Sequence, residues 1–464
     1  MKVILSHGYF LEEDPKEKEI MKPYPPLGIL YVSAFLDKNN IENSVFDSTF
    51  SSFSLFKEHL LKEKPNILAL YVNLMTKVNI VKIIRFVKST KELSGTKIIL
   101  GGPEVRYHAA NFLAVGANFI VIGEGEETML ELVTKLADSS TNYESIKSIA
   151  FLNSEGTIVY TPERVLIKNI DELSVPARHK VDLTNYFKAW ESKHGYSVLS
   201  VSTMRGCPYT CKWCSRAVYG QTYRRRSAKL VVDELEYLTK QYARNTFWFV
   251  DDVFTVSHKW LEQFNSEIKA RNLKIKYECI TRADRMNEEV IKLLQSSGCF
   301  RVWIGAESGS QDVIDRMDRR VNVEKVREMI QLTKKYYVEA GTFIMLGYEG
   351  EQEKDIIETA NHLKSSNPDY YTITIAYPIK GTPFYTDTEH KFLQKLNWET
   401  TTDRDIDFKR TYSRKYYDYA VRWVYNEVAA NKATRLNARV RFIYAKTKSW
   451  VLRFAMHYEK LKGV

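Results

Sequence analysis

Three of the chain's five cysteines lie close together in the stretch RGCPYTCKWCSRAVYGQTYRRRS, which runs from 205 to 227. Cys207, Cys211 and Cys214 have the spacing C-x3-C-x2-C. Clustered thiolates bind zinc or iron–sulfur clusters, and both kinds of site usually take four protein ligands. Three thiols on one short loop therefore predict a [4Fe–4S] cluster with one iron open to a substrate. The alternative is a zinc site completed by a His or a distant Cys.

The other two cysteines lie far along the chain in apolar surroundings. Cys279 belongs to an apolar strand pattern and Cys299 precedes another, so we expect both to be buried in the core. Such a set of cysteines does not indicate a disulfide framework. The N-terminus MKVILSHGYF becomes polar too soon for a signal peptide, and no apolar run reaches about 18 residues. We therefore expect a cytoplasmic protein.

The elements that must position the cysteine loop form a strand–helix alternation over residues 196–385. Six apolar runs alternate there with amphipathic segments of helical length, which predicts a parallel sheet curled into a partial (βα)6 barrel. The cysteine loop follows the first run, on the side where barrels carry their chemistry. The six predicted strands are 196–203, 246–252, 274–282, 299–308, 340–348 and 369–378.

Residues 1–140 show the same alternation and predict a doubly wound, Rossmann-like parallel sheet. Its five predicted strands are the apolar runs 2–7, 43–48, 66–73, 97–102 and 119–125. Ligands bind at the carboxyl edge of such a sheet. Two glycine-containing loops, LGGPE and IGEGE, follow predicted strands there and would let a bulky, flat ligand approach the backbone. Tight strand-to-helix turns are the alternative interpretation. The residues concerned are Gly101, Gly102, Pro103, Gly123, Glu124 and Gly125.

The remaining segments are a connection over 141–195, expected to pack against both domains, and a basic helical extension over 386–464. The net charge is +11, and residues 409–464 alone hold 14 Lys and Arg against three acids. Apolar or neutral residues recur there every three to four positions, which predicts a basic amphipathic helix. It could lie on an anionic membrane or pack its stripe on the barrel. The stripe is Val440, Tyr444, Thr447, Val451, Phe454, Tyr458 and Leu461.

These motifs together resemble the radical S-adenosylmethionine enzymes that carry an N-terminal cobalamin-binding domain. The similarity spans about residues 1–390 and continues from the cysteine loop through FWFVDDVF, RVWIGAESGSQDVIDRM, GTFIMLGYEGE and TIAYPIKGTPFY. In the first domain it includes PPLGILYVSAFL, LGGPE and IGEGEET. The resemblance implies that the three cysteines bind a [4Fe–4S] cluster whose open iron chelates S-adenosylmethionine. One electron would then cleave this cosubstrate to a 5′-deoxyadenosyl radical.

The resemblance also implies contacts to S-adenosylmethionine at the strand ends. Asp251 and Asp252 end the second strand, where the family contacts the methionine amino group, but the usual glycine pair before the acid is absent. Which of the two carboxylates makes the contact therefore stays open. Arg282 ends the third strand and could pair with a carboxylate.

The fourth and fifth strands carry the remaining expected contacts. Glu307 and Ser308 end the fourth strand, where ribose hydroxyls need partners. Gly341 and Gly347 bound the part of the fifth strand expected to contact adenine through its backbone. A structural alternative is open for the lone arginine and serine, because strand-end polar residues also cap helices.

The first domain departs from the cobalamin motif D-x-H-x-x-G. Its counterpart is DSTFSS, where Asp47 is present but Thr49 and Ser52 replace the His and the Gly. A bound cobalamin would lack that His ligand, as is common in this branch; alternatively the domain no longer binds cobalamin. His7 and His108 lie at strand ends and could approach the ligand.

The function implied is methylation of an unactivated carbon in a small-molecule natural product or lipid. The expected partners are that substrate, a reduced flavodoxin- or ferredoxin-type electron donor and, through the tail, a membrane surface. One alternative is oxidative cyclisation or rearrangement of a tetrapyrrole or hopanoid-like substrate. A zinc-stabilised nucleic-acid-binding protein is the alternative from another class, although the tail shows no recognisable RNA-binding module.

Overall fold

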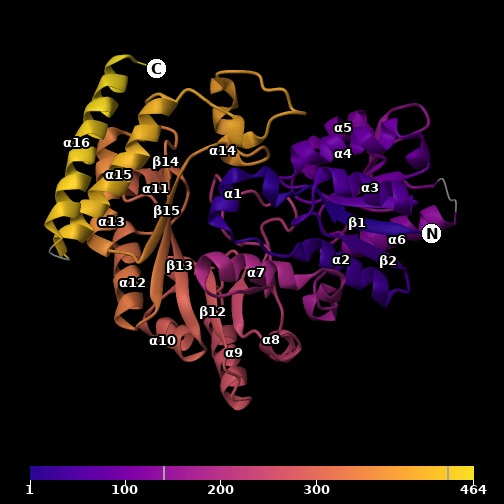
Figure 1. Ribbon diagram of the computed structural model, residues 1–464, viewed down its shortest axis with the longest axis horizontal. Coiled ribbons are helices and arrows are strands. Elements are labelled where there is room, and N and C mark those ends of the chain that lie inside the picture. The colour runs from indigo at the N-terminus through magenta and orange to yellow at the C-terminus, as the bar shows by residue number, and fades with distance from the viewer. Residues whose placement is uncertain (139–141, 436–437, 464) are drawn as a thin grey trace.

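The computed structural model describes residues 1–138, 142–435 and 438–463. Figure 1 shows two α/β units side by side, with a pair of long helices at the end of the molecule opposite the first unit. This is the predicted fold class: a Rossmann-like domain, a partial barrel and a helical C-terminal extension. No helix in these described ranges is both long and apolar enough to cross a bilayer.

The first sheet has seven strands in the order β2-β1-β3-β4-β5-β6-β7, and β1 to β5 are parallel. Its first five strands confirm the five predicted apolar runs. The strands are β1 (Val3–His7), β2 (Asn43–Phe46), β3 (Ile67–Tyr71), β4 (Lys97–Gly101), β5 (Phe119–Val121), β6 (Ile149–Leu152) and β7 (Ile158–Tyr160).

Helices cover both faces of this sheet because its strands are apolar on both sides. In β1, Val3 and Leu5 pack on one face and Ile4 packs on the other, as the two-residue period of a strand requires. One face carries α2 (Leu27–Lys38) and α6 (Glu126–Ala137). The opposite layer contains α3 (Phe53–Glu63), α4 (Lys77–Ser89) and α5 (Val105–Val115), and the short α1 (Pro15–Ile20) precedes α2.

The segment predicted as a connection is anchored to both units. Its strand β6 pairs antiparallel with β5, and β7 pairs antiparallel with β6, so the first sheet continues to Tyr160. Further on, α7 (Leu183–His194) contributes Leu183, Tyr186 and Phe187 to the core of the second unit. The predicted boundary at 140/141 lies outside the described residues.

The second sheet has six parallel strands in the order β15-β14-β13-β12-β11-β8. Each coincides with one of the six predicted runs, and sequential strands are neighbours, as in a partial barrel. The strands are β8 (Leu199–Val201), β11 (Thr246–Phe249), β12 (Lys276–Thr281), β13 (Cys299–Glu307), β14 (Glu339–Leu346) and β15 (Tyr370–Ile375). Cys279 and Cys299 are buried in this core, which confirms their prediction.

Helices with clear start signals surround the second sheet. Ser227 caps α8 by accepting a hydrogen bond from the backbone N–H of Leu230, and Asn287 caps α10 in the same way. Apolar residues at helical spacing then face the strands. The helices are α8 (Ala228–Tyr242), α9 (His258–Ala270), α10 (Glu288–Ser296), α11 (Gln311–Arg316), α12 (Val323–Lys335), α13 (Glu353–Ser366) and α14 (Pro383–Thr388).

The C-terminal extension folds as an antiparallel helix pair, α15 (Arg414–Arg435) and α16 (Arg439–Leu461). The inner helix α15 packs on α13 and β15 and adds Tyr417, Trp423 and Val424 to the core. The outer helix α16 packs mainly on α15. The predicted basic helix is thus confirmed, and its neighbour is α15.

Candidate functional site

A short antiparallel ribbon holds the cysteine loop at the end of β8. The ribbon consists of β9 (Met204–Arg205) and β10 (Arg224–Arg225), and the loop is everything between them. Gly206 enters the loop with φ +84°, and a Cβ there would lie 2.6 Å from the backbone oxygen of Thr222. Only glycine fits this close approach between the two ends of the loop.

The three thiols of the loop differ in environment. Cys207 is half-buried, Cys211 is buried and Cys214 is exposed. A hydrogen bond from Cys214 and the charge of Arg319 lower the pKa of Cys211 to about 5. The same bond raises the pKa of Cys214, and burial raises that of Cys207. No three metal-binding side chains in the described ranges are spaced to hold a single metal ion.

Two arginines face the buried thiol of the loop. Nη1 of Arg282 and Nη1 of Arg319 each lie 3.6 Å from Sγ of Cys211. Arg282 directly follows β12, and its guanidinium lies 3.8 Å from the ring of Tyr209. Positive charge beside a thiol favours the thiolate, which is the form that binds iron. The donors of this loop therefore fit an iron–sulfur cluster.

A cavity of about 420 Å³ lies between the first sheet and the cysteine loop. All six residues predicted from the glycine-containing loops line it: Gly101, Gly102, Pro103, Gly123, Glu124 and Gly125. Cys207, Asp251 and Asp252 line the same cavity from the second unit. Gly102 has φ +115°, and a Cβ there would lie 2.4 Å from the backbone oxygen of Val72. The first sheet thus offers a bare backbone edge that fits a flat ligand such as cobalamin.

The Glu124 side chain also fastens the two units together. Its Oε1 and Oε2 lie 2.8 Å from Arg205 and from Arg224, respectively, and it accepts a hydrogen bond from the N–H of Ile167. Arg205 also pairs with Glu126 and lies between the rings of Tyr31 and Tyr219. No sequence signal pointed to these partners, although both arginines flank the cysteine loop in the printed sequence.

The two aspartates that follow β11 differ in what they contact. Asp251 is buried and accepts hydrogen bonds from the N–H groups of Thr203 and Met204, at 2.7 and 3.2 Å. Asp252 is exposed to the cavity and makes no hydrogen bond with any described residue. Although the side chain is open to the cavity, partial desolvation by the protein around it and the charge of Asp251 raise the pKa of Asp252. Asp252 is therefore the carboxylate that is free to receive an ammonium group.

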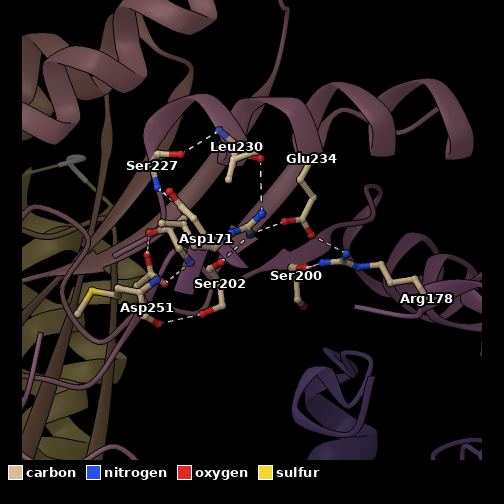
Figure 2. Close-up of polar contacts among 11 residues, drawn as sticks. Asp171, Arg178, Ser200, Ser202, Ser227, Leu230, Glu234 and Asp251 are labelled. Atoms are coloured by element: carbon tan, nitrogen blue, oxygen red, sulfur yellow. Dashed lines mark hydrogen bonds and ion pairs between the residues drawn. The ribbon is translucent and has the colours of Figure 1, made fainter. Parts of the chain in front are cut away.

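A second ionic network, formed by residues that do not line the cavity, joins the connecting segment to α8 and β8. Figure 2 shows Glu234 of α8 between two arginine side chains, with Asp171 and Ser227 nearby. Glu234 pairs with Arg178 at 2.6 Å and also with Arg226, and these charges keep its pKa low despite complete burial. Arg178 donates to the carbonyl of Ser200 in β8. The connecting segment is thereby tied to the barrel.

Two residues predicted to contact ribose are engaged inside the protein. Glu307 ends β13 with φ +65° and pairs with Arg319 at 3.5 Å; burial raises its pKa. Ser308 is buried, and its hydroxyl lies 3.1 Å from that of Thr359 and accepts from the N–H of Ser310. These contacts of Ser308 within the protein agree with the alternative interpretation, in which the serine has a structural role.

The two glycines of the fifth strand lie at opposite ends of it. Gly341 is near the start of β14, where a Cβ would lie 2.4 Å from the ring of Trp303. Gly347 follows the end of β14 with φ +77° and donates to Glu351 at 2.6 Å. The structure therefore brings Gly347, and not Gly341, to the carboxyl end of the barrel strands.

Neither of the two histidines lines the cavity. His7 Nε2 lies 3.0 Å from Asp47, which also accepts a hydrogen bond from the hydroxyl of Tyr186. His108 is buried on α5, 3.9 Å from Glu104, and its ring is tilted against that of Trp398, with the ring centroids 5.7 Å apart. The lone aspartate of the DSTFSS stretch is thus used for packing between the units.

Two family models match the chain, one for each unit. The B12 binding domain model matches residues 19–133, and the radical SAM superfamily model matches residues 201–363. An uncharacterized methyltransferase of Pyrococcus horikoshii is 27% identical over 392 residues, which cover 82% of each chain. The anaerobic magnesium-protoporphyrin IX monomethyl ester cyclase of Rubrivivax gelatinosus is 27% identical over 361 residues, which cover 76% of this chain and 64% of the cyclase.

A solved structure has the same arrangement of units. The cobalamin-dependent S-adenosylmethionine radical enzyme OxsB, with aqua-cobalamin and S-adenosylmethionine bound, superposes with a TM-score of 0.75 at 15% identity. The match covers 98% of this chain and 72% of OxsB and shows a common fold. Both domain matches and the fold agree with the cavity and the cysteine loop. The chain therefore combines a B12 binding domain with a radical SAM superfamily domain, and the cofactors of these domains are cobalamin, S-adenosylmethionine and a [4Fe–4S] cluster.

Proposed function

We propose that this enzyme is a C-methyltransferase that acts on an unactivated carbon of a small-molecule or lipid substrate. The observation that carries the proposal is the cavity of about 420 Å³, which is lined by both glycine loops and by the cysteine loop. The methyltransferase name of the Pyrococcus horikoshii relative supports it. When bound, the cluster and S-adenosylmethionine would supply the 5′-deoxyadenosyl radical, and cobalamin would supply a methyl group.

The residues of this chain have distinct roles in the proposal. Cys207, Cys211 and Cys214 hold the cluster, and Arg282 and Arg319 offset the negative charge of its thiolates. Asp252 receives the ammonium group of S-adenosylmethionine. Holding both reaction partners across one cavity replaces an encounter in solution by a fixed approach.

The glycine loops and the ion pairs between the units complete the arrangement. Gly102 and Gly123 let the flat face of cobalamin lie against the backbone, because neither carries a side chain. Glu124 holds its loop against Arg205, two residues before the first cysteine. The separation of the two cofactors is thereby set by contacts of the protein itself.

The test uses protein purified without oxygen, reconstituted with iron, sulfide and hydroxocobalamin, and incubated with S-adenosylmethionine and a strong reductant. Iron, cobalamin, 5′-deoxyadenosine and S-adenosylhomocysteine are quantified. Bound cobalamin with both nucleoside products supports methyl transfer. Deoxyadenosine alone assigns cyclisation or rearrangement, as the name of the Rubrivivax relative would suggest.

Matched cysteine variants show whether the products depend on the loop. Cys211→Ala should lose bound iron and both products. Cys299→Ala, which removes a buried thiol of the barrel core, should keep the iron. Zinc bound at the loop without either product would overturn the proposal.

A further inference from the structure

The outer helix α16 has an unusual distribution of apolar side chains. Its buried face, against α15, consists of Ala445, Ser449, Met456 and Glu459. Its larger apolar residues face away from the protein, which is the reverse of an ordinary surface helix. They are Val440 (82% exposed), Ile443 (62%), Tyr444 (62%), Trp450 (72%), Val451 (64%), Phe454 (74%), Tyr458 (55%) and Leu461 (73%).

These residues form one continuous stripe, here called the α16 stripe. At about 100° per residue, their positions fall on one side of the helix along its whole length. The predicted stripe was expected to face either a membrane or the barrel, and in the structure it faces neither α15 nor the barrel sheet. A contiguous exposed apolar patch of this kind indicates an interaction surface. Figure 1 places α16 at the end of the molecule opposite the first sheet.

Basic side chains border the α16 stripe on both sides. By the same helical geometry, Arg439, Lys446 and Arg453 lie along one border. Arg441, Lys448 and Lys462 lie along the other. The helix contains one acid, Glu459, which is buried. A negatively charged partner is therefore favoured on both sides of the stripe.

Several of these charges are available to a partner. Arg439, Arg441 and Lys448 are exposed and form no ion pair with a described residue. Lys448 Nζ lies 4.2 Å from the ring of Tyr444, and Lys462 Nζ lies 4.3 Å from that of Tyr458. The ammonium groups of both lysines thus lie over aromatic rings at the border of the stripe, and that of Lys462 also pairs with Glu459 at 3.5 Å.

We propose that α16 docks this protein on an anionic lipid bilayer, lying in the plane of the membrane with the α16 stripe at the boundary between headgroups and acyl chains. Aromatic and aliphatic side chains between two basic borders are the pattern of an in-plane membrane helix. A second copy of the chain fits less well. Pairing two α16 stripes about a twofold axis would bring basic borders together, whereas anionic lipids neutralise them.

The test measures sedimentation of the full-length holoenzyme with phosphatidylcholine vesicles, with and without phosphatidylglycerol. We expect binding to the anionic vesicles. Binding to the neutral vesicles should be weaker by about ten-fold or more. The double variant Trp450→Ser/Phe454→Ser should weaken anionic-vesicle binding about ten-fold or more. The triple variant Arg439→Gln/Arg441→Gln/Lys448→Gln should remove most of the difference between the two lipid compositions.

The control is Tyr337→Ser, which removes an aromatic side chain that is 92% exposed but lies outside α16. It should bind vesicles as the wild type does, and all variants should keep the iron content of the wild type. Absence of binding to anionic vesicles, or binding that the α16 variants leave unchanged, overturns the proposal. A concentration-dependent dimer that the same variants abolish would assign the stripe to a second copy instead. None of these outcomes depends on the methyltransferase proposal.

Discussion

Two buried carboxylates in this molecule are each held by two arginines, but they hold different parts together. Glu234 joins Arg178 of the connecting segment to Arg226 beside α8, away from the cavity. Glu124 joins the first sheet to Arg205 and Arg224 around the cysteine loop, at the wall of the cavity. The same chemistry thus serves as scaffold in one place and as the link between the two units at the cavity wall in the other.

A third buried carboxylate, Glu104, lacks such partners. Its Oε2 has no hydrogen-bond partner among the described residues, and it lies 3.9 Å from the buried His108. Burial and the charge of Asp403 raise its pKa to about 7, whereas the pKa of Glu234 is lowered. Charge on a buried carboxylate therefore depends on the arginines and not on the depth of burial alone.

The largest effect is expected from Glu234→Ala, which leaves two buried arginines without their carboxylate. We expect a loss of about 3–5 kcal/mol in the free energy of unfolding, because uncompensated buried charge is costly. Urea denaturation measures it. The control is Glu236→Ala, which removes a partly exposed carboxylate from the same helix. A loss as small as that of the control would contradict a scaffold role for Glu234.

The next effect concerns Glu104 and pH. Its pKa is raised from about 4.5 to about 7 on folding, so it stabilises the fold at low pH, and this contribution of about 3 kcal/mol disappears as the pH rises to 7. Burial lowers the pKa of His108 to about 3, so its contribution has the opposite slope. Relative to the wild type, Glu104→Gln should therefore gain stability between pH 4.5 and 7. Parallel pH–stability curves would disprove the assignment.

A smaller loss of stability, about 2 kcal/mol, is expected from Glu124→Ala, because Arg205 lines the cavity and keeps its pairing with Glu126, and Arg224 keeps its hydrogen bond to the carbonyl of Ile167. The same variant should also bind cobalamin more weakly. Affinity measured by absorbance titration should fall roughly ten-fold or more, since the loop that carries Gly123 and Gly125 loses its anchor. Glu127→Ala on the adjacent exposed surface is the matched control. Unchanged cobalamin affinity would show that Glu124 is scaffold only.

Asp252→Asn should have the smallest effect on stability, below about 0.5 kcal/mol, because its side chain has no described hydrogen-bond partner to lose. Deoxyadenosine formation at limiting S-adenosylmethionine should nevertheless fall about ten-fold, the cost of losing one charge-assisted contact. Asp251→Asn should show the reverse pattern, with a lower midpoint of unfolding. Equal effects of the two variants on both measurements would refute the division of roles.

The sequence predicted those features that depend on local pattern. All five first-sheet runs and all six barrel runs were recognisable, because most of these strands are buried on both faces and are nearly continuous apolar stretches, whereas β2 and β15 are partly exposed. The glycine loops were found for a similar reason, since a glycine directly after a strand marks a close backbone approach. The spacing of the three cysteines was enough to single them out as candidate ligands of a cluster.

Contacts between distant segments could not be predicted in this way. Arg319 approaches Cys211 from beyond the fourth strand, and nothing in the run RMDRRV distinguishes it from Arg320, which is exposed. Asp251 and Asp252 are chemically identical in the sequence, and only the turn that places Thr203 above one of them separates their roles. Such choices are made by tertiary packing.

The two strands β6 and β7 have a consequence for cutting the chain into its parts. A first domain that ends before β6 would leave β5 as an unpaired edge, with backbone donors and acceptors free to join another chain. A fragment continued through Tyr160 would keep that edge covered by a short hairpin. We therefore expect the shorter fragment to aggregate and the longer one to stay dispersed.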